Sequence, residues 1–116
     1  SHVTSDMKCA RDETFGRAAP VFQCKTEEAG IAMANAAEFG LACYFYSRDI
    51  GRCWRVGEAL DYGMVGINEG LISTAEAPFG GVKDSGMGRE SGWEGFEPYV
   101  ELKSIGVPKD YADSLA

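Results

Sequence analysis

A long glycine-rich segment in the second half of the chain constrains the fold most. Asn68–Glu90 carries five glycines and one proline and has almost no helical or strand period. Long loops inside a compact domain are usually either functional or disordered. Here the glycines alternate with Phe79, Val82 and Met87, which a disordered linker would avoid. Because glycine has no Cβ, its backbone can turn tightly and lie against another backbone or a ligand, so we expect an ordered wall of a site.

Size and charge narrow the class of protein. The 116 residues suit one small domain with a modest core. The net charge of −7 argues against nucleic-acid or anionic-membrane partners, which require a basic face. No apolar run approaches the roughly 20 residues of a membrane span, and the N-terminus lacks the pattern of a signal peptide. Ser1 and His2 are either a tag remnant or native sequence.

The cysteines indicate a reducing compartment. Cys9, Cys24, Cys43 and Cys53 form no CxxC pair, and His2 stands far from any ligand spacing, so we expect no metal site. We expect buried free thiols in the cytoplasm or, alternatively, the mitochondrial matrix. The flanking sequence offers no clear base that would activate any of them as a nucleophile.

The hydrophobic pattern predicts alternating strands and helices. Strands are expected at Val3–Cys9, Ala19–Cys24, Leu41–Tyr46, Tyr62–Ile67 and Val100–Val107. Helices are expected from an N-cap at Thr26 to about Glu38, from a cap at Ser47 or Asp49 to Leu60, and irregularly over Gly92–Tyr99. In the second helix the inward positions are Ile50, Cys53, Trp54, Gly57 and Leu60. This order predicts an α/β fold, a three-layer βαβαβ unit with parallel strands and right-handed crossovers.

The last expected strand has no obvious partner within the chain. An unpaired edge is a liability, so we expect Val100–Val107 to pair in another subunit or with sequence missing here. Residues 1–99 would then form the α/β unit, residues 100–107 a pairing strand, and residues 108–116 a polar tail. The glycine-rich segment follows the strand Tyr62–Ile67, at the sheet edge where α/β folds bind ligands.

Several motifs, in order, resemble the carboxy-terminal part of the aldehyde dehydrogenase superfamily. They are Glu13–Gly16 and Pro78–Glu90, followed at the family's spacing by Gly92, Gly95, Tyr99 and Lys103. Gly63–Ser73 is most similar to the succinate-semialdehyde dehydrogenase branch. The resemblance covers about residues 3–107. It implies the second half of an aldehyde dehydrogenase catalytic domain, an oligomerisation strand at Val100–Val107, and a homo-oligomer.

The resemblance also implies contacts with a nicotinamide cofactor, NAD or NADP. Glu13 matches the residue whose carboxylate accepts hydrogen bonds from the two hydroxyls of the nicotinamide ribose, and two carboxylate oxygens suit a vicinal diol. Phe15 matches an aromatic that lies against the nicotinamide. Arg17 stands where the family usually has proline, which should loosen this loop. Without the resemblance, Glu13 would be interpreted as a solvated loop acid and Phe15 as core.

Two further positions match residues of the family's substrate tunnel. Ser73 matches a hydroxyl that helps to hold the distal carboxylate of the aldehyde substrate; the alternative is a turn serine bonded to its own backbone. Phe79 matches an aromatic of the tunnel wall, which is compatible with ordinary packing. Lys83, Arg89 and Glu90 would hold the loop structurally.

The resemblance implies a dehydrogenase that oxidises succinate semialdehyde to succinate, yet the catalytic residues are absent. The family's cysteine nucleophile, glutamate base and dinucleotide-binding domain lie upstream of the matched region. We therefore assign no catalytic residue and expect the chain alone to be inactive. The choice between NAD and NADP is made in the absent domain. The competing hypothesis is a non-catalytic, self-associating α/β module that uses Val100–Val107.

Overall fold

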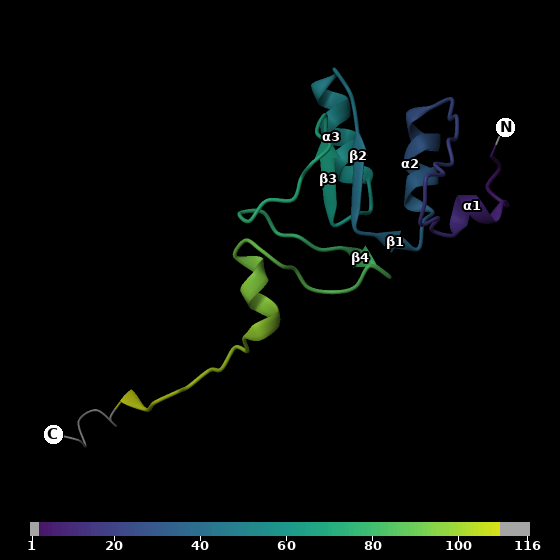
Figure 1. Cartoon of the computed structure of the whole chain (residues 1–116). Helices are drawn as coiled ribbons and strands as arrows, with labels where there is room; N and C mark the ends of the chain where they lie inside the picture. Colours follow the sequence, from purple (N-terminus) through teal and green to yellow (C-terminus); the bar gives the residue numbers. More distant parts are fainter. Residues whose placement is uncertain (1–2, 110–116) are drawn as a thin grey trace.

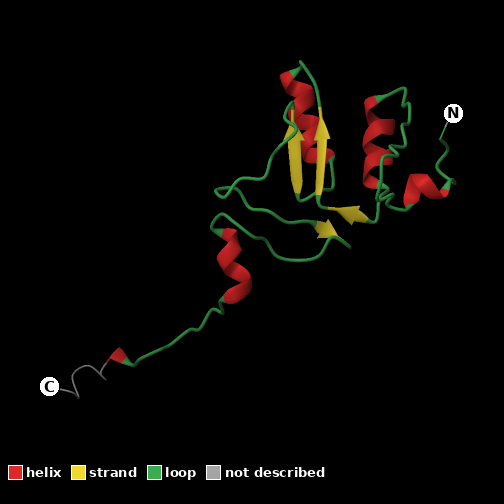
Figure 2. Ribbon diagram, viewed as in Figure 1, coloured by secondary structure: helices red, strands yellow, loops and turns green. Residues whose placement is uncertain are grey.

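The computed structural model describes residues 3–109. Figures 1 and 2 show two small sheets with helices beside them and an extended carboxy-terminal segment. The elements in chain order are α1 (Lys8–Arg11), α2 (Glu27–Asn35), β1 (Phe39–Gly40), β2 (Ala42–Phe45), α3 (Ile50–Ala59), β3 (Met64–Ile67), β4 (Val82–Lys83) and the 3₁₀ helix η1 (Glu94–Tyr99).

The β2–α3–β3 unit forms the centre of the fold. β2 and β3 pair in parallel over four rungs, from Ala42 opposite Met64 to Phe45 opposite Ile67, as the strand–helix–strand pattern predicts. α3 begins at the expected cap Asp49, whose carboxylate accepts the backbone N–H of Arg52. The two apolar side chains that are buried among the described residues, Cys53 and Val56, both come from α3. The small hydrophobic core of the described chain therefore lies between α3 and the elements that it contacts, β3 and α2.

A second sheet brings the glycine-rich segment back to the start of the α/β unit. β1 and β4 pair antiparallel, with Gly40 opposite Val82. A Cβ on Gly40 would lie 2.8 Å from Cγ2 of Val82 and 2.9 Å from the carbonyl oxygen of Asp61. Glycine is needed here for close packing in a strand.

α2 begins as the sequence predicts but ends early. The hydroxyl of Thr26 accepts the backbone N–H of Ala29, which confirms the N-cap. The helix ends at Asn35, before the predicted Glu38. Residues 36–38 instead form the turn that leads into β1.

The two strands predicted near the N-terminus are not present. Residues 3–9 make turns that enter α1, with the N–H of Met7 donating to the carbonyl of Thr4, and Ala19–Cys24 is unpaired and exposed. A strand is stable only when its N–H and C=O groups find a neighbouring strand, and the described chain offers these segments none. The three-layer βαβαβ unit is thereby reduced to one βαβ unit with α2 beside it.

The predicted inward face of α3 is wrong at two positions. Ile50 is 74% exposed and Trp54 is 68% exposed, whereas Val56, which the sequence analysis did not select, is 8% exposed. A two-stranded sheet covers a narrow stripe of the helix, so the flank with Ile50 and Trp54 has no sheet to contact. Its apolar side chains are left at the surface.

The carboxy-terminal part extends away from the sheets. η1 confirms the short irregular helix and contains Pro98. Val100–Val107 is exposed and forms no strand in the described chain (Figure 2). The Cα radius of gyration is 21.8 Å, whereas about 13 Å is typical of a compact domain of this length. No helix in the described range, residues 3–109, is both long and apolar enough to cross a membrane.

Candidate functional site

The glycine-rich loop leaves the carboxyl end of β3 and is tied down at both ends. At its start, a carboxylate oxygen of Glu69 accepts the N–H groups of Gly70 and Leu71, at 2.8 and 3.1 Å. At its far side, Phe79 and Glu90 exchange two backbone hydrogen bonds of 2.7 Å. The loop therefore has the ordered path that its composition predicts.

Two glycines let the loop lie directly on the backbone below it. A Cβ on Gly63 would collide with the carbonyl oxygen of Gly80 and would lie 2.8 Å from Cα of Gly81. A Cβ on Gly81 would in turn lie 3.2 Å from the carbonyl oxygen of Gly40. Neighbours that are backbone atoms cannot move aside as a side chain can, so these contacts require glycine.

Arg89 and Lys83 hold the loop as structural residues. The guanidinium of Arg89 donates to the carbonyls of Gly81 and Gly88, at 2.7 and 2.8 Å. The Lys83 ammonium donates to the carbonyls of Asn35 and Ala37, at 3.0 and 3.2 Å. A cation at the end of α2 satisfies carbonyls that have no helical partner and interacts favourably with the helix dipole.

Further contacts stabilise Lys83 in an unusual backbone conformation. Its φ of 55° lies in the left-handed region that side chains disfavour. The ammonium also lies 3.3 Å from Oδ2 of Asp61 and 5.4 Å from the ring centroid of Tyr62. These contacts join β4 to α2 and to the turn before β3, and so fix the base of the glycine-rich loop.

Burial lowers the reactivity of two ionisable side chains near the start of the glycine-rich loop, Cys43 and Tyr62. Desolvation raises the pKa of the Cys43 thiol. Desolvation, followed by the charges of Cys43 and Asp61, raises the pKa of the Tyr62 hydroxyl, which donates to the carbonyl of Ala34 at 2.8 Å. Neither group is therefore prepared to act as a nucleophile or base at neutral pH.

All four cysteines are free, but the expectation that they are buried is wrong for two of them. Cys53 is buried and Cys43 is half-buried, whereas Cys9 and Cys24 are exposed. Cys24 lies in the segment 19–24, where the predicted strand does not form. Among residues 3–109, no cluster of His, Cys, Asp and Glu side chains could hold a metal ion.

The predicted substrate residues lie on the glycine-rich loop. The side chain of Ser73 is exposed and makes no hydrogen bond with the rest of the described chain, which does not favour a turn serine. Phe79 is half-buried beside Glu90. The described fold thus leaves the Ser73 hydroxyl free for a ligand.

The predicted cofactor residues lie elsewhere. Glu13 and Phe15 follow α1 in an irregular exposed segment, and Phe15 is 97% exposed. In Figure 1 this segment and the loop after β3 lie on opposite sides of β1. The structure therefore brings Ser73 and Phe79 onto one loop but does not bring Glu13 and Phe15 to them.

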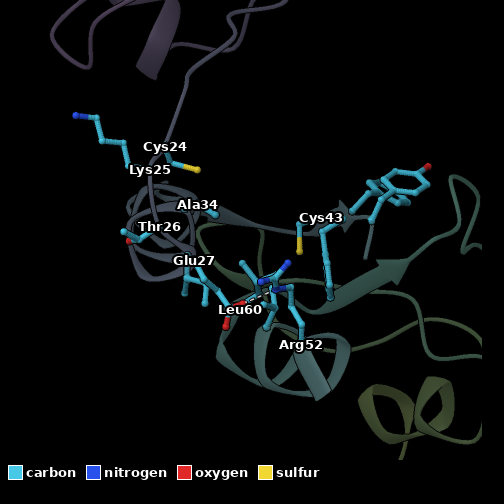
Figure 3. A pocket seen from close by; sticks show the side chains of 14 residues that line it. Cys24, Lys25, Thr26, Glu27, Ala34, Cys43, Arg52 and Leu60 are labelled. Carbon is cyan, nitrogen blue, oxygen red and sulfur yellow. Dashed lines mark hydrogen bonds and ion pairs between the residues drawn. The ribbon is translucent and has the colours of Figure 1, made fainter. Parts of the chain in front are cut away.

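A pocket of about 510 Å³ lies between α2, β2 and α3, away from all four predicted residues. Figure 3 shows Cys24 on the α2 side of this pocket and Cys43 on the sheet side. Arg52, which also lines it, donates to the carboxylate of Glu27 at 2.7 Å, and Arg55 donates to the same carboxylate at 3.2 Å. Because this carboxylate is already paired, the pocket has no free acid that would mark a catalytic centre.

Sequence reasoning missed two asparagines that tie the loops together. Asn35 donates to the carbonyl of Ala59 and accepts the N–H of Asp61, both at 2.8 Å. Asn68 makes a similar pair of bonds with Ser47 at the end of β3. Asparagine at the end of a helix or strand is the available signal, because its short amide reaches nearby backbone.

The chain is similar to known proteins along most of its length. The aldehyde dehydrogenase family profile matches residues 1–105. Human mitochondrial succinate-semialdehyde dehydrogenase is 59% identical over 104 residues, 90% of this chain and 19% of the relative. The Acinetobacter baylyi succinate semialdehyde dehydrogenase is 57% identical over 101 residues, 87% of this chain and 21% of the relative.

A solved structure agrees with this similarity. The crystal structure of succinate-semialdehyde dehydrogenase from Burkholderia pseudomallei superposes with a TM-score of 0.80 and 61% identity, over 84% of this chain and 20% of that one. The chain thus spans about a fifth of the length of the relatives it matches. On this evidence the chain belongs to the aldehyde dehydrogenase family.

Proposed function

We propose that this chain is part of an NAD(P)-dependent aldehyde dehydrogenase that oxidises succinate semialdehyde to succinate. The observation that carries the proposal is the glycine-rich loop, which is ordered at the carboxyl end of β3 and leaves the hydroxyl of Ser73 free. Its relatives at 57–59% identity carry the name of that enzyme. None of the residues described is proposed as the nucleophile or the base.

Glu13 and Phe15 are proposed as cofactor contacts. The carboxylate of Glu13 is exposed and makes no ion pair within the described chain, and the ring of Phe15 is almost fully exposed. A free carboxylate two residues before an uncovered aromatic ring fits a ribose diol next to a flat, apolar-faced nicotinamide. When bound, the nicotinamide would accept the hydride of the aldehyde. The protein's part is to hold and orient the ribose.

Ser73 and Phe79 are proposed as substrate contacts. The Ser73 hydroxyl would donate to the distal carboxylate of succinate semialdehyde, and the ring of Phe79 would form part of an apolar wall along its carbon chain. The anchors at Glu69 and at the Phe79–Glu90 pair keep both residues on one ordered loop. Preorganisation of this kind lowers the entropic cost of binding.

The chain alone is proposed to be inactive and to depend on other parts. Glu13 and Phe15 lie apart from the Ser73 loop, and the relatives are about five times longer. Residues 1–99 would be part of a catalytic domain, residues 100–107 an oligomerisation strand that pairs in another subunit, and residues 108–116 a tail. Residues 1–2 and 110–116 lie outside the described range. Free thiols fit a reducing compartment, cytoplasmic or, as in the name of the human relative, mitochondrial.

A second candidate function is a self-associating module without catalysis. The observation that favours it is the row of exposed apolar side chains in the extended segment after η1, namely Val100, Leu102, Ile105 and Val107. Such a segment can add to the sheet edge of a second copy. A purified chain that stays monomeric in light scattering would exclude this candidate.

A chimaera tests the first candidate directly. The corresponding segment of the Acinetobacter baylyi enzyme is replaced by this chain, and NAD(P)H formation is followed with succinate semialdehyde. We expect turnover, about a tenfold or larger rise in the KM for the cofactor in Glu13→Gln, and about a tenfold rise in the KM for the aldehyde in Ser73→Ala. A folded chimaera without turnover would contradict the proposal, as would turnover by the isolated chain.

A further inference from the structure

Asn68 closes the parallel sheet at the point where the glycine-rich loop departs. Its backbone N–H donates to the carbonyl of Phe45 at 2.9 Å, which makes it the last rung between β2 and β3. Its φ of 57° then turns the chain out of the strand direction. Asparagine tolerates this left-handed conformation better than most residues do.

The side chain of Asn68 adds two reciprocal bonds to this rung. Its Oδ1 accepts the backbone N–H of Ser47, and its Nδ2 donates to the backbone carbonyl of the same residue, both at 2.8 Å. The amide thus replaces the pair of hydrogen bonds that a further residue of the strand would supply. Both polar ends of the amide are satisfied, so its rotamer is fixed.

Ser47 connects this amide to the start of α3. The Ser47 hydroxyl accepts the N–H of Asp49 at 3.1 Å. Asp49 is the cap whose carboxylate accepts the N–H of Arg52 in the first turn of the helix. Asn68 is therefore hydrogen-bonded to a rigid corner of the βαβ unit.

The other side of Asn68 leads directly to the proposed substrate residue. Glu69 holds the N–H groups of Gly70 and Leu71, and Ser73 follows two residues later. Beyond Ser73, the carbonyl of Ala75 accepts the N–H of Gly92 at 3.1 Å. The free stretch that carries Ser73 is therefore short, and its direction is set by where the chain leaves Asn68.

We propose that Asn68 is a positioning residue that aims the Ser73 loop at the carboxylate of the substrate. The inference rests on the proposed function for the identity of that carboxylate. Asn68 does not itself touch the substrate. Its amide fixes the exit of the loop relative to β2 and α3, so that discrimination between a carboxylated aldehyde and an uncharged one depends on it.

The test uses Asn68→Asp with Asn35→Asp as its matched control. Each change is isosteric and converts a donor on a backbone carbonyl into an acceptor, but Asn35 bridges α2 to the turn before β3 and does not touch the loop exit. In the chimaera described above, we measure KM and kcat for succinate semialdehyde and for butanal. Asn68→Asp should raise the KM for succinate semialdehyde about tenfold and change the values for butanal less than about twofold.

Two further variants test whether the effect is specific to the side-chain amide of Asn68. Asn35→Asp should leave unchanged the ratio of kcat/KM for succinate semialdehyde to kcat/KM for butanal. Asn68→Gly keeps the left-handed backbone but removes both hydrogen bonds of the side-chain amide. It should lower this ratio, as Asn68→Asp does. Equal losses for both aldehydes, or no change in either variant, would overturn the positioning role.

Amide exchange in the chain separates this inference from the proposed function. Asn68→Gly should speed hydrogen exchange at the N–H groups of Ser47, Gly70 and Leu71, and Asn35→Asp should not. Unchanged exchange at these sites would also overturn the positioning role. A wild-type chimaera that does not prefer succinate semialdehyde over butanal would refute the proposed substrate, while the exchange result would still decide whether Asn68 fixes the loop.

Discussion

The β2–α3–β3 unit and the N-terminal segment 12–25 differ in what holds them. In the first, each strand has its neighbour within 25 residues of sequence, and the helix between them buries Cys53 and Val56. In the second, residues 12–25 form no helix and no strand, and almost every side chain is exposed. The N-terminal segment also contains apolar residues, among them Val21 and Phe22, so apolar character alone does not explain the difference.

An apolar, strand-like sequence forms a strand only where a neighbouring strand is available to accept and donate its backbone hydrogen bonds. Ala19–Cys24 has the apolar character of Leu41–Tyr46, yet only the latter forms hydrogen bonds to a neighbour. A backbone that finds no partner stays extended and solvated. Under the proposed function, the N-terminal segment would find such a partner in the parts of the dehydrogenase that this chain does not span.

The largest difference between the two regions is expected for a methyl group added to glycine. Gly63→Ala should destabilise the chain by about 3 kcal/mol or displace the glycine-rich loop, because the new Cβ meets backbone atoms of Gly80 and Gly81. Gly16→Ala, where no atom lies within 4 Å of the added Cβ, should be neutral or slightly stabilising. Thermal unfolding followed by circular dichroism measures both variants, and equal effects would show that the two regions are packed alike.

Truncation of a valine should distinguish the regions by a smaller amount. Val56→Ala removes two buried methyl groups and should cost about 2 kcal/mol. Val21→Ala, in the exposed segment, should change the free energy of unfolding by less than about 0.5 kcal/mol. Urea titration measures both, and a substantial loss in Val21→Ala would show that the N-terminal segment packs in the isolated chain.

A lysine at the base of the glycine-rich loop and a lysine in the extended carboxy-terminal segment should differ in their contribution to stability. Lys83→Met should cost about 1 kcal/mol, because it leaves the carbonyls of Asn35 and Ala37 without their donor. Lys103→Met, in the extended segment 100–107, serves as the control and should have no measurable effect. If the two variants unfold at the same temperature, the ammonium does not anchor β4 to α2.

The smallest expected effect is on how the free energy of unfolding decreases at acid pH. The backbone N–H of Glu28 and the hydroxyl of Thr26 hold the pKa of the Glu28 carboxyl below its ordinary value. The charged form therefore stabilises the folded state above the unfolded pKa, roughly pH 4, and this contribution is lost as pH falls through the lower folded pKa. Glu28→Gln should slightly weaken the dependence of the free energy of unfolding on acid pH, and Thr26→Val should weaken the same dependence. If this dependence is unchanged in both variants, Glu28 does not contribute to stability in this way.

The sequence predicted those features whose causes are local. The cap at Thr26 is predicted, and Asp49 is one of two predicted candidates for the second cap, because a cap needs a side chain and an N–H three residues away. The order of β2, α3 and β3 followed from short-range periodicity. The order of the glycine-rich loop is predicted from Phe79, Val82 and Met87. In the structure Phe79 and Val82 are half-buried, as that argument requires, whereas Met87 is fully exposed.

The remainder depends on distant or absent partners. The exposure of Ile50 and Trp54 follows from how many strands the sheet has, which no pattern within α3 encodes. The side-chain hydrogen bonds of Asn35 and Asn68 join residues more than 20 positions apart, and such bonds leave only a weak signal in the sequence. The roles of Glu13, Phe15, Ser73 and Phe79 come from the family resemblance and remain predictions, because the structure does not bring the first two residues to the last two.

Amide hydrogen exchange of the isolated, monomeric chain distinguishes an incomplete fold from one that is complete by itself. If the chain is an incomplete part of a dehydrogenase, the amides of β2 and β3 should be protected, while those of residues 12–25 and 100–107 should exchange at nearly unprotected rates. In the chimaera the same two segments should gain protection. Equal protection of all three regions in the isolated monomer would contradict the account, because the chain would then complete its own fold.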